Sequence, residues 1–157
     1  MRNTWNNALG PFRRREELTE QELSDPGLIE LQTSSGTDVY PAFQFETDED
    51  THHLNPRIAR AWPIVKNMQI EQLGESSWSA ASRLTADREE FGNASWADVL
   101  MDPEVTDDQA DEVYTAIVVD AFRGARLGGD LHDPTDQLPE TSAGVFSRVV
   151  NRALEQI

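Results

Sequence analysis

One stretch of the sequence decides the fold: TDDQADEVYTAIVVDAF, residues 106–122. Its apolar residues recur at helical spacing, on a stripe that includes Val113 and Ile117. Thr106 and Gln109 stand at the two positions of a capping box, and the acidic residues after Thr106 suit the positive end of a helix dipole. The stretch therefore predicts an amphipathic helix whose apolar face must be covered by other elements.

Three further helical patterns precede this one. Residues 56–73 carry apolar side chains near helical spacing, and Pro63 in their middle predicts a kink or a break. A second helix is expected to start near Ser77, and a short third one at Ser95, which forms a capping box with Asp98. Helices should therefore make up most of the fold.

A hairpin is the main β signal. Two apolar runs, LIELQ at 28–32 and VYPAFQF at 39–45, flank a turn-rich segment. Pro41 cannot donate a ladder hydrogen bond, so it belongs on an edge or where the strand leaves its partner. Phe43 and Phe45 would share one face, with the glutamine between them on the other. The predicted fold class is therefore mainly α with a small β-hairpin, which lays its apolar face on helices.

The ends of the chain differ from its middle. Residues 1–24 predict an N-terminal arm that is disordered or holds one short helix, and residues 25–123 predict the folded domain. Residues 124–157 predict a linker rich in Asp, Pro, Gly and Thr, followed by an amphipathic helix from Val145. The apolar stripe of that helix must be buried on the domain itself or on a partner, and the sequence leaves both open.

Composition narrows the function classes. The chain has 29 acidic and 13 basic residues, and its formal net charge of -16 disfavours binding to nucleic acid and to anionic membranes. Without cysteine there is no disulfide, thiolate nucleophile or Cys-ligated zinc. The apolar runs are too short to span a bilayer, and the N-terminus lacks a signal-peptide core, so a cytoplasmic protein is expected.

Catalytic and metal-binding motifs are weak. His52 and His53 adjoin an acidic loop, but adjacent histidines usually diverge, which favours a solvated loop over a metal site. His132 and Asp133 lie in the predicted linker with no nucleophile motif. The basic run 13–15 could touch nucleic acid but reads more simply as a solvated arm. We therefore expect a binding protein without cofactor, with a metal-dependent hydrolase and a DNA-binding repressor as alternatives.

Two segments resemble the C-terminal toxin-binding domain of Xre/MbcA/ParS-type antitoxins. The run at 39–45 resembles that domain's YPAFQF hairpin, and residues 78–100 resemble its tryptophan-containing stretch. Within the second segment, residues 83–86 stand where the family has WL.TPN, and residues 91–92 stand where LGG begins. Residues 97–100, ADVL, stand where ELL ends. The likeness spans about residues 28–122.

The chain also departs from the family pattern. Asn93 replaces the second glycine, Trp96 stands where a proline is expected, and the usual N-terminal helix-turn-helix has no room in residues 1–24. The missing helix-turn-helix puts operator binding in doubt.

The resemblance implies a function. Such a protein would bind and neutralise a RES-domain toxin, an NAD-degrading enzyme, by covering its active-site cleft, and it could form a homodimer. An adaptor or phage-type protein that binds another partner through the same domain is the alternative. The residues expected at the partner surface are Phe91, Gly92, Trp96, Arg123, Arg126, Phe146, Val149 and Val150. Tyr40, Pro41, Phe43 and Phe45 are expected to build the hairpin.

Overall fold

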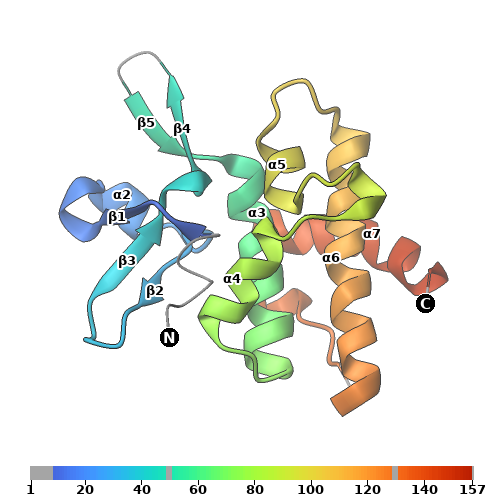
Figure 1. The fold of residues 1–157 in the computed structure, drawn as a ribbon. Helices are drawn as coiled ribbons and strands as arrows, with labels where there is room; N and C mark the ends of the chain where they lie inside the picture. The colour runs from blue at the N-terminus through green and yellow to red at the C-terminus, as the bar shows by residue number, and fades with distance from the viewer. Residues whose placement is uncertain (1–8, 49–50, 129–130, 157) are drawn as a thin grey trace.

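The chain folds with its strands and one short helix on one side and its other helices on the other (Figure 1). The computed structural model describes residues 9–48, 51–128 and 131–156, and the side chains of 47–48, 51–52 and 126–128 lie outside that description. The fold class is mainly α with a small β part, as the sequence predicts.

The helical side is built around three long segments that pack on one another. These are α3 (Pro56–Val65), α6 (Asp107–Gly128) and α7 (Glu140–Glu155), with α7 lying against both α6 and α3. The shorter elements are α4 (Ser77–Thr85), the 3-10 turn η4 (Glu89–Phe91), α5 (Trp96–Met101) and the 3-10 turn η5 (Thr135–Gln137).

Local capping explains where several helices begin. Ser95 and Asp98 form the predicted capping box at the start of α5, and the Ser76 hydroxyl accepts a hydrogen bond from the Ser79 amide at the start of α4. At α6, the Thr106 hydroxyl accepts the Gln109 amide while the Gln109 side chain accepts the Thr106 amide. These starts depend on neighbouring residues alone, which is why the sequence predicts them.

Pro63 changes the helix that contains it. It lies inside α3, and the chain continues directly into a π-helical segment, η3 (Lys66–Gln72). Proline has no N–H for the carbonyl of Ala59, four residues earlier. Gly27 approaches that same region so closely that a Cβ on it would lie 2.1 Å from the Ala59 carbonyl oxygen. The predicted break is thus a change of helix type with a backbone crossing beside it.

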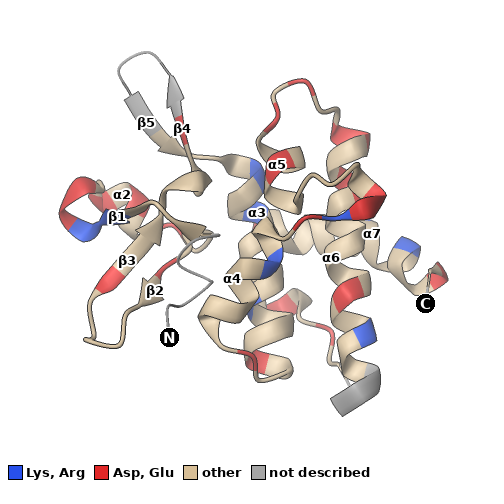
Figure 2. Ribbon diagram, viewed as in Figure 1, with Lys and Arg blue, Asp and Glu red and all other residues tan. Residues whose placement is uncertain are grey.

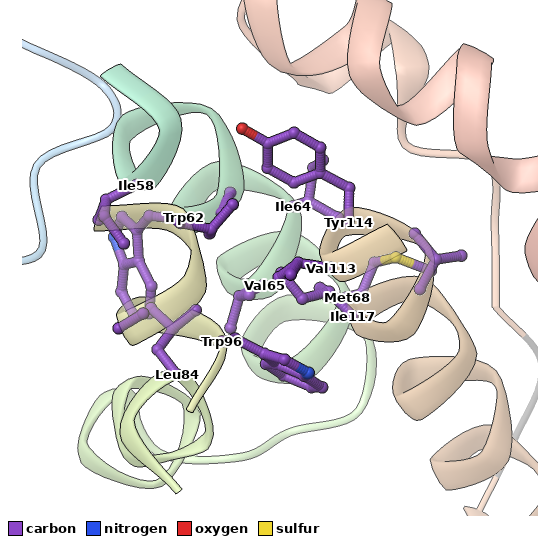
Figure 3. Close-up of a cluster of buried hydrophobic side chains, with 14 of the residues drawn as sticks. Ile58, Trp62, Ile64, Val65, Met68, Leu84, Trp96, Val113, Tyr114 and Ile117 are labelled. Atoms are coloured by element: carbon purple, nitrogen blue, oxygen red, sulfur yellow. The ribbon is translucent and has the colours of Figure 1, made fainter. Parts of the chain in front are cut away.

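Apolar side chains from α3 to α6 form the core (Figure 3). Trp62 and Val65 of α3, Trp96 of α5 and Ile117 of α6 are almost completely buried. Burying side chains of this size contributes about 1.5–3 kcal/mol each for the aliphatic ones. The stripe predicted on residues 106–122 is therefore the wall on which the other helices pack.

Two small antiparallel sheets make up the β side. The first has the order β1 (Phe12–Arg14), β3 (Asp38–Pro41), β2 (Leu31–Gln32), and the second pairs β4 (Phe45–Asp48) with β5 (Thr51–Leu54). The predicted hairpin exists as the β2–β3 pair, with Leu31 opposite Val39. Residues assigned to the N-terminal arm extend it, because Phe12 pairs with Pro41. That arm also holds one short helix, α2 (Glu20–Leu23), with a capping box at Thr19.

The hairpin residues are not arranged as simple alternation predicts. The chain turns through a 3-10 segment, η2 (Ala42–Gln44), so Gln44 is fully buried and Phe43 only partly. The Gln44 side chain accepts the Ile29 amide at 2.8 Å and donates to the carbonyls of Ile29 and Pro41, both at 3.0 Å. Tyr40 and Phe45 are buried in a small cluster of their own. The side chain of Gln44 thus makes hydrogen bonds to the backbone of the kind that a neighbouring strand would make, just after β3 ends at Pro41.

The C-terminal segment belongs to the helical core. Helix α6 runs on past Gly124 to Gly128, and α7 begins at Glu140, before the predicted Val145. The Ser142 hydroxyl donates to the Arg60 carbonyl at 2.8 Å, and Arg148 binds Asp111. Of the two possibilities left open, α7 therefore docks on its own chain.

Within residues 9–48, 51–128 and 131–156, no helix combines the length and the apolar character needed to cross a bilayer.

Candidate functional site

A groove of about 580 Å³ lies where α6, α7 and the segment before α5 meet. Its floor is formed by the apolar side chains of Trp96, Ala116 and Val119, and its rim carries charged side chains from all three segments. The full lining is Arg88, Glu90, Phe91, Trp96, Glu112, Thr115, Ala116, Val119, Asp120, Arg123, Arg152 and Gln156.

A tight loop shapes one wall of the groove. The backbone of Arg88 pairs with that of Ala94, and the Asn93 amide donates to the Arg88 carbonyl at 2.8 Å. Gly92 and Asn93 both adopt left-handed backbone, with φ of 65° and 68°. Glycine adopts this conformation readily and asparagine is among the few other residues that do. Asn93 is therefore suited to the place where the resembled family has its second glycine.

Arg88 lies flat on Trp96. Its guanidinium carbon is 3.8 Å from the centre of the indole ring, and its Nη2 donates to the Arg83 carbonyl at 2.9 Å. Two buried donors beside each other, Arg88 Nε and Trp96 Nε1, have no acceptor among the described residues. A cation stacked on an aromatic face is held in place, so this wall of the groove is fixed in shape but short of acceptors.

The arginines around the groove fall into two kinds. Arg83, just behind it, donates to Glu75 and, at 2.8 Å, to Asp120, and its hydrogen bond to the Glu75 carboxylate is the main reason that the pKa of Arg83 is raised. Arg123 and Arg152 on the rim are exposed, and within the described residues neither has an acid within ion-pair distance. The groove thus has guanidinium groups that are free to bind.

The structure brings together three of the predicted partner-surface residues. Phe91, Trp96 and Arg123 all line the groove. Gly92 lies in the wall next to Phe91 but does not line the groove, and the side chain of Arg126 lies outside the described residues. These three residues come from different elements, so only the fold makes them one surface.

The predicted surface residues of the last helix are placed differently. Phe146 and Val149 are buried in the core, 4% and 0% exposed, so the prediction that they face a partner is wrong for this structure. The reason is that α7 covers α6 and α3 with that face. Val150 is half-buried and lines a second hollow of about 320 Å³, which Phe146 and Phe122 also line. Leu154, near the end of α7, is 55% exposed.

Arg88 and Arg152 are among the groove residues that were not predicted from the sequence. Arg88 carries no motif, and its stacking on Trp96 follows from the 88–94 loop. Arg152 lies on the face of α7 beside the core stripe, and reaches the groove only because α7 folds back on α6. Arg152 could have been predicted only by knowing that α7 packs on α6.

Of the histidine candidates, His53 and His132 make contacts in the structure, and the side chain of His52 lies outside the described residues. His53 Nε2 lies 2.9 Å from Glu46 Oε2, and the backbone amide of His132 donates to Gln72 at 2.5 Å. Thr135 donates hydrogen bonds to the Asp133 carboxylate, and these lower the pKa of Asp133. Such bonds are typical of an aspartate that accepts from a backbone amide two residues further on in a turn. In the part of the chain that the structure describes, no three His, Cys, Asp or Glu side chains gather as a metal site.

No family model, curated protein or solved structure matches the chain.

Proposed function

We propose that this chain is an antitoxin-like binding protein that neutralises a RES-domain, NAD-degrading toxin by covering its active-site cleft. The observation that carries the proposal is the groove, because Phe91, Trp96 and Arg123, which the resemblance assigns to the partner surface, line it together. The resembled hairpin supports the same assignment, since residues 31–41 form a β-hairpin.

The C-terminal part of the predicted partner surface is not exposed. A tethered C-terminal helix inserted into the toxin would have to leave the core, because Phe146 and Val149 are buried there. A rigid face made of the 88–94 loop, α6 and the outer side of α7 can instead dock without that cost. Interface residues that are already held in place lose little entropy on binding, which favours affinity.

Charge supports the choice of partner. An enzyme that degrades an anionic dinucleotide needs an electropositive active-site entrance, and a protein of net charge -16 is attracted to such a surface. Figure 2 shows acidic positions spread over both the β side and the helices. The electrostatic field of these acidic residues is therefore suited to attracting an electropositive partner over long range, while the groove supplies the local contacts.

The test is co-expression with the RES-domain protein encoded nearest to this chain, with cell growth, cellular NAD and co-purification all measured. Growth and NAD should recover and a complex should purify. Ala116→Trp, which fills the groove floor, should abolish all three effects, whereas Ala86→Trp, at an exposed position after α4, should abolish none. Absence of rescue and of a complex with the unmodified chain would overturn the proposal in favour of an adaptor for another protein.

A further inference from the structure

The groove has an excess of unused donors. Arg123 and Arg152 extend from α6 and α7 without an acid partner among the described residues, and Arg88 Nε and Trp96 Nε1 are buried without an acceptor there. Because those two atoms are buried, the donors that a partner can reach are the exposed guanidinium groups of Arg123 and Arg152. What these two arginines lack is an acceptor.

The acids in the lining do not supply it. Asp120 is engaged by Arg83 at 2.8 Å and by Gln69 at 3.2 Å. Glu90 and Glu112 are exposed on the rim and form no ion pair with Arg123 or Arg152. The groove therefore presents guanidinium groups that no acid of the described residues neutralises, in a chain with 29 acidic residues.

We infer that the groove recognises a carboxylate side chain on an acidic segment of the protein partner, held between Arg123 and Arg152 over the Trp96–Arg88 wall. Guanidinium and carboxylate groups form charge-assisted, often bidentate hydrogen bonds. Arg88 is held by its contact with the Trp96 ring and by the Arg83 carbonyl, so it adds a positive charge to the groove wall beside the bound carboxylate. The apolar floor of Ala116 and Val119 suits the methylene groups of the same side chain.

This inference rests on the proposed function and names the chemistry by which the partner is recognised. The net charge of the chain attracts an electropositive partner over long range, but it does not set the register of docking. A pair of arginines that binds one carboxylate of the partner does set that register. The partner should therefore carry an Asp or Glu beside its electropositive cleft.

The experiment measures the dissociation constant of the complex by calorimetry with purified RES-domain partner at two salt concentrations. Arg123→Glu/Arg152→Glu should weaken binding at least about 100-fold, since it replaces two attractions by two repulsions. The control, Arg14→Glu/Arg15→Glu, makes the same change in net charge at exposed positions on the β side and should weaken binding far less. Circular dichroism and thermal melting of both variants should match the unmodified chain, because all four arginines are surface residues.

Three outcomes separate the possibilities. If the unmodified chain does not bind the partner, the proposed function fails. If it binds and the Arg123→Glu/Arg152→Glu variant binds equally well, the proposed function stands and the carboxylate inference is overturned. If that variant loses self-association in sedimentation but keeps the partner, a second copy occupies the groove and the inference is likewise overturned. Recovery of binding by an Asp or Glu→Lys change on the partner would identify the recognised acid.

Discussion

Gly27 shows how one residue can limit the approach of two segments. It crosses α3 at Ala59, whose carbonyl loses its helical donor to Pro63, and a Cβ on Gly27 would lie 2.1 Å from that oxygen and 2.5 Å from the Ala59 Cα. Backbone cannot yield by that amount without moving the turn that contains Gly27 away from the helix. The position therefore depends on having no side chain.

Gly27→Ala should lower the free energy of unfolding by about 3 kcal/mol, because overpacking against backbone cannot relax by a rotamer change. Urea denaturation followed by tryptophan fluorescence measures it. Gly144→Ala is the matched control: it lies inside α7 with nothing within 4 Å of the added Cβ, and should raise stability by about 0.5–1 kcal/mol. Equal effects of the two substitutions would contradict the assigned contact.

Tyr114 links stability to alkaline pH. Burial is the main cause that raises its pKa above the usual value, and its hydroxyl donates to the Arg57 carbonyl at 3.2 Å. The unfolded chain therefore ionises first, so stability is fully present below about pH 10 and falls as the pH rises through the higher pKa of the folded state.

The slope of unfolding free energy against pH between 9.5 and 11 should be smaller for Tyr114→Phe than for the unmodified chain. The comparison uses slopes because the variant also loses one hydrogen bond at every pH. Tyr40, whose pKa burial also raises, accounts for part of the remaining slope. An unchanged slope would show that Tyr114 does not contribute to the alkaline loss of stability.

At the scale of elements, the stability of α7 packed on α6 depends more on one ion pair than on the other charged side chains of α7. Arg148 donates to the two oxygens of Asp111 at 2.8 and 2.7 Å, and Asp111 is only 7% exposed. Removing the arginine leaves a buried carboxylate without its cation, which costs more than the pair itself contributes. The acid is thus the reason that the arginine matters.

Arg148→Ala should lower the free energy of unfolding by about 1–3 kcal/mol. Arg152→Ala, four residues further along the same helix and without an acid partner in the described residues, should change it by less than about 0.5 kcal/mol. Thermal melts of both variants provide the measurement. A loss as large for Arg152→Ala would show that helix α7 responds to charge in general and not to the Asp111 contact.

The elements that the sequence predicts well are those determined by near neighbours. The starts of α5 and α6 follow from Ser95 and Thr106, whose hydroxyls cap their own helices. Gln44 escapes the prediction because its partner Ile29 lies 15 residues away and its burial depends on a 3-10 turn. Similarly, the groove has walls from separate segments, and a sequence pattern carries no information on how α7 crosses α6.

For the whole molecule, the balance of charge sets how stability responds to salt. Arg57, Arg83 and Arg148 form ion pairs with acids, but 29 acidic residues against 13 basic ones leave a net charge of -16. Most acidic groups therefore repel one another without a compensating contact. Folding brings these charges closer together than in the extended chain.

The melting temperature should rise as sodium chloride is increased from 10 mM to about 0.5 M, because the Debye length falls from about 30 Å to under 5 Å over that range. Most of the rise should come at the low end, where screening changes fastest. A series with sodium sulfate at matched ionic strength separates screening from effects of the anion on hydration. A melting temperature that stays flat or falls would mean that attractive contacts outweigh the repulsion.

The hydrogen bond between Ser142 and Arg60 joins residues that are 82 positions apart. A ribosome that adds about 5–20 residues per second needs roughly 4–16 seconds to pass from one to the other. During that interval the nascent chain carries the inner face of α3 without the helix that covers it. Closure of the core is therefore a late step of synthesis, and a chain cut short before α7 would emerge with that face open to the chaperones that bind exposed apolar surface.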